Sequence, residues 1–178
     1  GNYDIIKTVL EQVNIPVAAK VSFYFTLLGR TLRSLSESGI KGLVVFNRFF
    51  SPDYDIENLK IVATNVFSTP QDLALSLRWI AIMHGRVACD LAASTGVHDG
   101  DGVIKQILAG ANVVQVASTL YKNGIDQVES MNRRLQEWMQ EQGYSNLAGF
   151  RGMLGQQNIG NPAAYDRVQF LKNYRKMR

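Results

Sequence analysis

The sequence predicts an α/β fold built from about four strand–helix units that follow one another along the chain. Short apolar runs alternate at roughly even spacing with segments whose apolar residues recur at helical intervals. This alternation is typical of parallel strands joined by right-handed crossovers. The runs are apolar on both sides, as a parallel sheet covered by helices requires. Two architectures satisfy these observations: an open doubly wound sheet and a (β/α)8 barrel.

Two helices and two strands are predicted in the first 47 residues, in the order helix, strand, helix, strand. Apolar residues at helical spacing predict helices over residues 2–13 and 25–38, and Gly39 is a plausible stop for the second. Apolar runs predict strands over residues 15–22 and 42–47. The second of these, which reads Gly-Leu-Val-Val-Phe-Asn, is the most β-like run in the chain.

A long connection over residues 48–69 separates these units from the next helix. Within it, residues 59–66 alternate enough to predict a short strand or the arm of a hairpin. The run Ser68-Thr69-Pro70 then opens a helix that continues to about Met83. A hydroxyl side chain that can cap the helix is followed here by proline, which is favoured at the first helical position.

The second half repeats the alternation and then passes into a tail. Strands are predicted over residues 86–93 and 112–117. Asp99 or Asp101 begins the helix between them, which ends at Gly110. Helical sequence follows the second strand through Gln142. The rest of the chain divides as follows: a short helical piece near 147–150, a Gly/Asn/Gln-rich stretch at 152–161, and a basic helix at about 162–177.

Composition excludes several classes of protein. The chain has 178 residues, of which 46% are apolar and 19% charged, so apolar residues are too plentiful for disorder. No uncharged apolar run approaches the ~20 residues that cross a bilayer, and the first residues show no signal-peptide layout. The net charge of +4 could favour an anionic ligand or a nucleic acid, but acidic and basic residues are mixed along most of the chain, so neither follows from charge alone. We expect no nucleic-acid partner. The single cysteine, Cys89, suits a reducing compartment, and we expect a cytoplasmic protein.

Polar residues follow each of the four predicted strands. In both architectures, ligands bind beyond the carboxyl ends of the strands. The four strand ends read Lys20-Val-Ser22, Phe46-Asn47-Arg48, Ala93-Ser94-Thr95-Gly96 and Ala117-Ser118-Thr119. A purely structural sheet does not need polar residues at all four ends. We therefore expect one site on this rim, built from several strands.

The last two strand ends predict either an anion site or simple helix caps. Small hydroxyl residues and Gly96 lead from each strand into a helix, and backbone N–H groups at helix starts bind anions. Phosphate sites after the last two strands recur in (β/α)8 enzymes. The alternative is that Ser94, Thr95 and Ser118 only cap helices. The residues alone leave both interpretations open.

Three further residues at or near the strand ends carry expectations. Lys20 ends a segment that looks buried, so its ammonium group should face an anion or an electron-rich partner. The Asn47 amide can pair with a planar heterocycle or a carboxylate, or it can form a turn. Arg48 is either a surface residue or an anion clamp.

The third strand and the histidines carry weaker signals. Asp90 lies inside the predicted strand, so it needs a cationic partner such as Arg86, Arg78 or Lys41. Cys89 is expected to pack in mid-strand. His84, Cys89 and His98 do not have the spacing of a zinc site, so no metal site is predicted.

Taken together, the strand ends resemble the dihydroorotate dehydrogenase family. The matching stretches are Lys20-Val-Ser-Phe-Tyr-Phe25, Val45-Phe-Asn-Arg48, Ala93-Ser-Thr-Gly-Val97 and Gln115-Val-Ala-Ser-Thr-Leu-Tyr-Lys-Asn-Gly124. They are similar to the C-terminal half of the soluble class 1 enzymes and of dihydroorotate dehydrogenase-like proteins. The resemblance covers nearly all of residues 1–155 and leaves residues 156–178 as a tail. It implies half of a (β/α)8 barrel that binds FMN and oxidises dihydroorotate to orotate in pyrimidine biosynthesis.

The resemblance also implies roles for individual residues. Lys20 is similar to the lysine that contacts the flavin, and Asn47 to an amide that binds orotate. Thr95 and Gly96 match the Gly-Gly turn on the FMN phosphate, with Ser94 beside them. Ala117 and Ser118 match a Gly-Thr/Ser pair on the same phosphate. If the family turn needs positive φ at Thr95 or Ala117, FMN binding would weaken.

A (β/α)8 barrel needs ~250 residues, so four units supply only half of it. The catalytic base is expected in an N-terminal half, and no residue of this chain is assigned that role. We therefore expect the chain to be part of a longer enzyme, inactive alone, with its own N-terminal half and a second copy as partners. Two alternatives stay open: another phosphate-binding barrel enzyme, such as an isomerase or aldolase, and a non-catalytic half-barrel that associates through its open edges.

Overall fold

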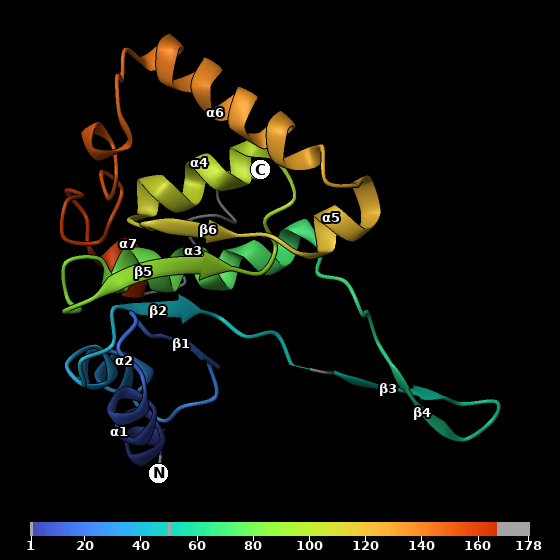
Figure 1. Cartoon of the computed structure of the whole chain (residues 1–178). Coiled ribbons are helices and arrows are strands. Elements are labelled where there is room, and N and C mark those ends of the chain that lie inside the picture. The colour runs from blue at the N-terminus through green and yellow to red at the C-terminus, as the bar shows by residue number, and fades with distance from the viewer. Residues whose placement is uncertain (1, 50, 167–178) are drawn as a thin grey trace.

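The structure is a computed structural model that describes residues 2–49 and 51–166, and it confirms the α/β architecture with parallel strands (Figure 1). The main sheet has four strands in the order β1-β2-β5-β6: Ala18–Val21, Gly42–Val45, Asp90–Ser94 and Val113–Gln115. Every pairing in this sheet is parallel. Three helices connect successive strands: α2 (Leu28–Ser36), α3 (Leu73–Met83) and α4 (Gly100–Ala109). The chain therefore has the four strand–helix units of half a barrel.

The core lies around β2, which is the most deeply covered strand. All four residues of β2 are buried, because the strand pairs with β1 on one side and with β5 on the other. Leu32 and Leu35 of α2 and Ile80 of α3 are at most 1% exposed and belong to the same apolar cluster. These helices bury their apolar faces against the sheet, which fixes where each strand ends.

The third main strand begins later than the sequence predicts. Residues 86–93 were expected to be extended, but β5 starts at Asp90, whose Cα is paired with Gly42. The N–H of Ala88 donates to the Ser36 hydroxyl at 3.0 Å, so this stretch packs as a loop beneath α2. Asp90 is exposed at the start of the strand and needs no buried cation, so that expectation is wrong. Cys89 precedes the strand but packs against the core, as predicted.

The outer strands are less covered than their apolar sequences predict. Within the described residues, β1 pairs only with β2, and β6 only with β5. Ala18 and Lys20 are exposed, so the expectation that Lys20 ends a buried segment is wrong. Residues of β6 alternate between exposed and half-buried. Both strands have one backbone edge that no described strand covers.

A hairpin projects from the body between β2 and α3 (Figure 1). Strands β3 (Pro52–Asp55) and β4 (Lys60–Ala63) are antiparallel, with Tyr54 opposite Ile61. This confirms the predicted hairpin arm, although β3 was not predicted. Nearly all of its residues are exposed, including both members of that pair.

The remaining helices follow the predicted order with small shifts. These are α1 (Asn2–Gln12), η1 (Pro70–Asp72), α5 (Ser118–Asn123), α6 (Gln127–Gln142), η2 (Leu147–Gly149) and α7 (Ala163–Asp166). The helical sequence after residue 118 is divided at Gly124, whose φ is +81°. The basic helix expected at 162–177 lies mostly outside the described residues. Over residues 2–49 and 51–166, no helix is long and apolar enough to span a membrane.

Candidate functional site

The four strand ends meet at one cavity of about 220 Å³. Lys20, Asn47, Gly96 and Ser118 line it together, one from each strand end. Ser94, Thr95 and Ala117 complete the set of predicted site residues on its wall. The arrows of β2 and β5 point toward α5 and the hairpin, so the carboxyl ends of these strands face that side of the molecule (Figure 1). The predicted convergence on one rim is therefore confirmed, while the roles of these residues stay predictions.

A second cavity of about 340 Å³ adjoins the first. The two share Asn47, Arg48, Ser94 and Thr95 as a common wall. The larger cavity also has four aromatic residues on its lining: Phe23, Tyr24, Phe46 and Phe49. The rim thus combines a polar chamber with an aromatic one.

The turn after β5 has an unusual backbone. Thr95 and Gly96 both have positive φ, at +80° and +79°. Glycine is required at position 96, since a Cβ there would lie 2.0 Å from the Leu73 nitrogen. Thr95 adopts a conformation that is rare for a β-branched residue, and its hydroxyl donates to the Phe46 carbonyl at 3.1 Å. Ala117 has φ of −140°, so of these two residues only Thr95 has positive φ.

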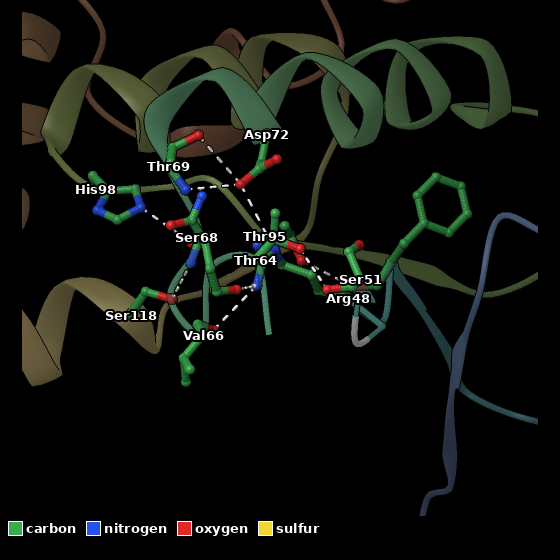
Figure 2. A network of polar contacts seen from close by, with 12 residues as sticks. Arg48, Ser51, Thr64, Val66, Ser68, Thr69, Asp72, Thr95, His98 and Ser118 are labelled. Atoms are coloured by element: carbon green, nitrogen blue, oxygen red, sulfur yellow. Dashed lines mark hydrogen bonds and ion pairs between the residues drawn. The ribbon is translucent and has the colours of Figure 1, made fainter. Parts of the chain in front are cut away.

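Segment 65–68, which leads from the hairpin to α3, forms one wall of the polar cavity through Val66 and Ser68. Arg48 holds the start of this segment (Figure 2). Its Nη1 donates to the carbonyls of Asn65, at 2.7 Å, and Val66, at 3.1 Å. Its Nε lies 3.7 Å from Asp72 Oδ2, an oxygen that also accepts from the Thr69 N–H at 2.7 Å. Arg48 is therefore half-buried within the protein's own network, and it is not a free surface residue.

The other end of segment 65–68 is held at Ser68, which is only 6% exposed. Its N–H donates to Ser118 Oγ at 2.9 Å, and its hydroxyl lies 3.1 Å from His98 Nε2 (Figure 2). Lys122 donates to the Ser68 carbonyl at 3.3 Å. His98 and Lys122 were not predicted as site residues. No local pattern could have identified them, because their contacts with Ser68 join residues 30 and 54 positions apart.

Hydrogen bonding fixes what two hydroxyls can offer to a ligand. A serine hydroxyl has one proton to donate and two lone pairs that accept. Ser118 Oγ accepts from Ser68, which leaves its proton available for the cavity. The Thr95 proton is already used on Phe46. Ser118 is therefore the better hydroxyl donor for a bound anion.

Two further observations limit the chemistry of the described residues. Among residues 2–49 and 51–166, no cluster of three His, Cys, Asp or Glu residues could hold a metal ion. Partial burial, together with the negative charge of Asp90, raises the pKa of the Cys89 thiol. A raised pKa disfavours the thiolate, and Cys89 lies outside both cavities, so it is not a candidate nucleophile.

Comparison with known proteins confirms the resemblance to dihydroorotate dehydrogenases. No protein-family model matches the chain. It is 27% identical over 128 residues to the catalytic subunit of dihydroorotate dehydrogenase B (NAD(+)) from Methanocaldococcus jannaschii, covering 70% of this chain and 42% of that protein. The corresponding subunit from Saccharolobus solfataricus is 27% identical over 143 residues, covering 79% and 49%. The chain thus spans less than half the length of these relatives.

Solved structures show the same fold. The DHODH of Eimeria tenella in complex with ferulenol superposes with a TM-score of 0.63 at 21% identity, covering 76% of this chain and 37% of that one. The ligand-free form of the same enzyme gives a TM-score of 0.63 at 22% identity. The four parallel strand–helix units described above therefore have the arrangement of part of a dihydroorotate dehydrogenase barrel.

Proposed function

We propose that this chain is the C-terminal half of an FMN-dependent dihydroorotate dehydrogenase, which oxidises dihydroorotate to orotate. The observation that carries the proposal is the polar cavity, where Lys20, Asn47, Gly96 and Ser118 converge from four strand ends. The same four residues lie in the stretches through which the sequence resembles the family. Enzymes with this fold bind their ligands at this end of the strands.

The polar cavity suits the phosphate of FMN by the chemistry of its donors. The Ser118 proton is free to donate to the phosphate, and Lys20 adds positive charge to the cavity as a whole. Among the described residues that line this cavity there is no acidic side chain. Ser94 adds a second hydroxyl to the wall. These groups can bind a phosphate even though Thr95 uses its own hydroxyl elsewhere.

The remaining residues orient ligands in this proposal. When bound, FMN supplies the acceptor for the hydride that leaves the dihydropyrimidine. Lys20 provides positive charge beside the flavin ring and stabilises negative charge that develops there. The Asn47 amide donates and accepts hydrogen bonds, which holds a planar ring in a fixed orientation.

The proposal includes a complementary half, which carries the catalytic base and further substrate contacts. The uncovered edges of β1 and β6 are where its strands would pair. We propose that this half is the N-terminal part of the same barrel, that the complete enzyme is a homodimer, and that it works in the cytoplasm. The division of this chain into a barrel part, 1–155, and a tail, 156–178, stays a prediction.

The absorbance spectrum of the purified protein tests cofactor binding directly. We expect a flavin spectrum when this chain is combined with the N-terminal half and FMN, and dihydroorotate oxidation only in that mixture. The chain alone should show no turnover. A colourless complex, or full activity of the chain alone, would contradict the proposal.

One observation favours a second candidate, a barrel enzyme for a different phosphorylated ligand. Thr95 brings a side chain and positive φ to a turn where the resemblance implies glycine. A complete protein that binds phosphate but never takes up FMN would support this candidate. Sedimentation of the chain alone tests the further alternative of a self-associating half-barrel.

A further inference from the structure

We propose that Arg48 is a positioning residue, which holds segment 65–68 against the polar cavity and so keeps the anion site formed. The identity of the anion rests on the proposed function, but the positioning role does not. The inference comes from the contacts of Arg48, which join two cavity walls that are distant in sequence.

Arg48 links the end of β2 to segment 65–68 through strong hydrogen bonds. Two backbone carbonyls, of Asn65 and Val66, accept from the same guanidinium nitrogen. Hydrogen bonds from a charged donor are stronger than those between neutral groups. The bonds join residues 17 and 18 positions apart, so they close the base of the projecting hairpin onto the rim.

Segment 65–68 depends on such bonds because it buries little apolar surface. Val66 is 78% exposed and Phe67 38% exposed. Phe67 contacts Tyr121, which is itself 80% exposed, so this ring pair gives little burial. The segment continues directly from a hairpin whose strands contact mainly each other. Loss of Arg48 would leave the Ser68 contacts to hold the segment at one end only.

Arg48 acts through this segment, because Nη1 and Nε already serve contacts within the protein. Its Nη1 is occupied by two carbonyls, and its Nε faces the Asp72 carboxylate. The negative charge of Asp72 offsets the attraction that Arg48 would exert on an anion. Arg48 holds Val66 and Ser68 in place on the wall of the polar cavity. The Ser68 N–H in turn donates to Ser118 Oγ, which orients the Ser118 hydroxyl.

The test compares three variants of this chain by amide hydrogen exchange and by titration with inorganic phosphate. Arg48→Ser removes the link. Arg48→Lys keeps the charge and can restore one hydrogen bond. Arg30→Ser is the matched control, since Arg30 is exposed on α2 and lines neither cavity. Heat denaturation checks that each variant is folded.

In Arg48→Ser we expect amide exchange in segment 65–68 to accelerate at least about tenfold, since one charge-assisted hydrogen bond has roughly that effect on an equilibrium. Phosphate affinity should fall several-fold, Arg48→Lys should be intermediate, and Arg30→Ser should match the wild type in both measurements. Exchange in β2 and β5 should not change.

Unchanged exchange in segment 65–68 of Arg48→Ser would overturn the proposal, and so would phosphate affinity equal to or above that of the wild type. If Arg48→Ser does not fold, Arg48→Lys decides the question. Moderately faster exchange in segment 65–68 together with weaker phosphate binding supports positioning, and unchanged exchange, or faster exchange without loss of affinity, overturns it. If the wild-type chain itself binds no phosphate, the anion site of the proposed function is wrong, and exchange alone decides the role of Arg48.

Discussion

Replacing Gly96 with alanine should destabilise the protein more than the same change at an otherwise similar glycine. Gly96 has φ of +79° and Gly143 has φ of +76°, so an added Cβ meets the same backbone penalty at both, about 1–2 kcal/mol. The surroundings differ. A Cβ at Gly96 would lie 2.0 Å from the Leu73 nitrogen and 2.6 Å from the Asp72 carbonyl carbon, whereas at Gly143 nothing lies within 4 Å.

The difference between the two variants isolates the steric cost. Forcing extra volume against a packed backbone costs about 1–3 kcal/mol. We therefore expect Gly96→Ala to lower the free energy of unfolding by about 2–5 kcal/mol and Gly143→Ala by about 1–2 kcal/mol. Urea denaturation followed by circular dichroism measures both. If the two variants lose the same free energy of unfolding to within about 0.5 kcal/mol, which is the usual limit of additivity, the close approach of α3 to the turn after β5 is refuted.

Three other predictions follow from single contacts. Because the pKa of Cys89 is raised in the folded state, the folded protein keeps a proton that the unfolded chain releases, so the free energy of unfolding should fall as the pH rises above ~8.5. Asp90→Asn should weaken this pH dependence. Urea denaturation at several pH values measures both. Ser76→Ala should cost about 1–3 kcal/mol of stability, because the fully buried Gln106 amide loses the hydroxyl to which it donates at 2.8 Å. The double variant Ser76→Ala/Gln106→Leu should recover part of that loss in the same assay, because it also removes the amide left without its acceptor. Lys20→Met should weaken phosphate binding in a calorimetric titration, because Lys20 lines the polar cavity. It should leave stability nearly unchanged, because Lys20 is exposed. A phosphate affinity equal to that of the wild type would show that Lys20 is not part of the anion site.

Much of the fold could be predicted because apolar spacing and capping residues act locally. Asp99 caps α4 by accepting from the Gly102 N–H, and Gly39 follows α2 with positive φ. The third main strand was misplaced because Val87 and Ala88 are apolar without being extended. Their backbone is fixed by Ser36, and no pattern near residue 88 indicates that contact.

The position of the site could also be predicted, but not the contacts that shape it. Parallel strands end on one side, so Lys20, Asn47 and Ser118 converge for topological reasons. The exposure of Lys20 follows from the place of β1 at the end of the sheet, which only the strand order reveals. The bond between Arg48 and Asn65 depends on the path of the hairpin, and no local signal specifies that path.

The parallel direction of the two outermost strands restricts what can complete this sheet. Because β1 and β6 point the same way, a segment that closes this sheet into an all-parallel ring must offer one strand to each of them, both with that same polarity. A single added hairpin cannot do so, since its two strands run in opposite directions. The segment that completes such a ring is therefore another run of strands joined by crossover connections. It can come from the same polypeptide or from a second copy of this chain related to the first by a twofold axis along the centre of the ring.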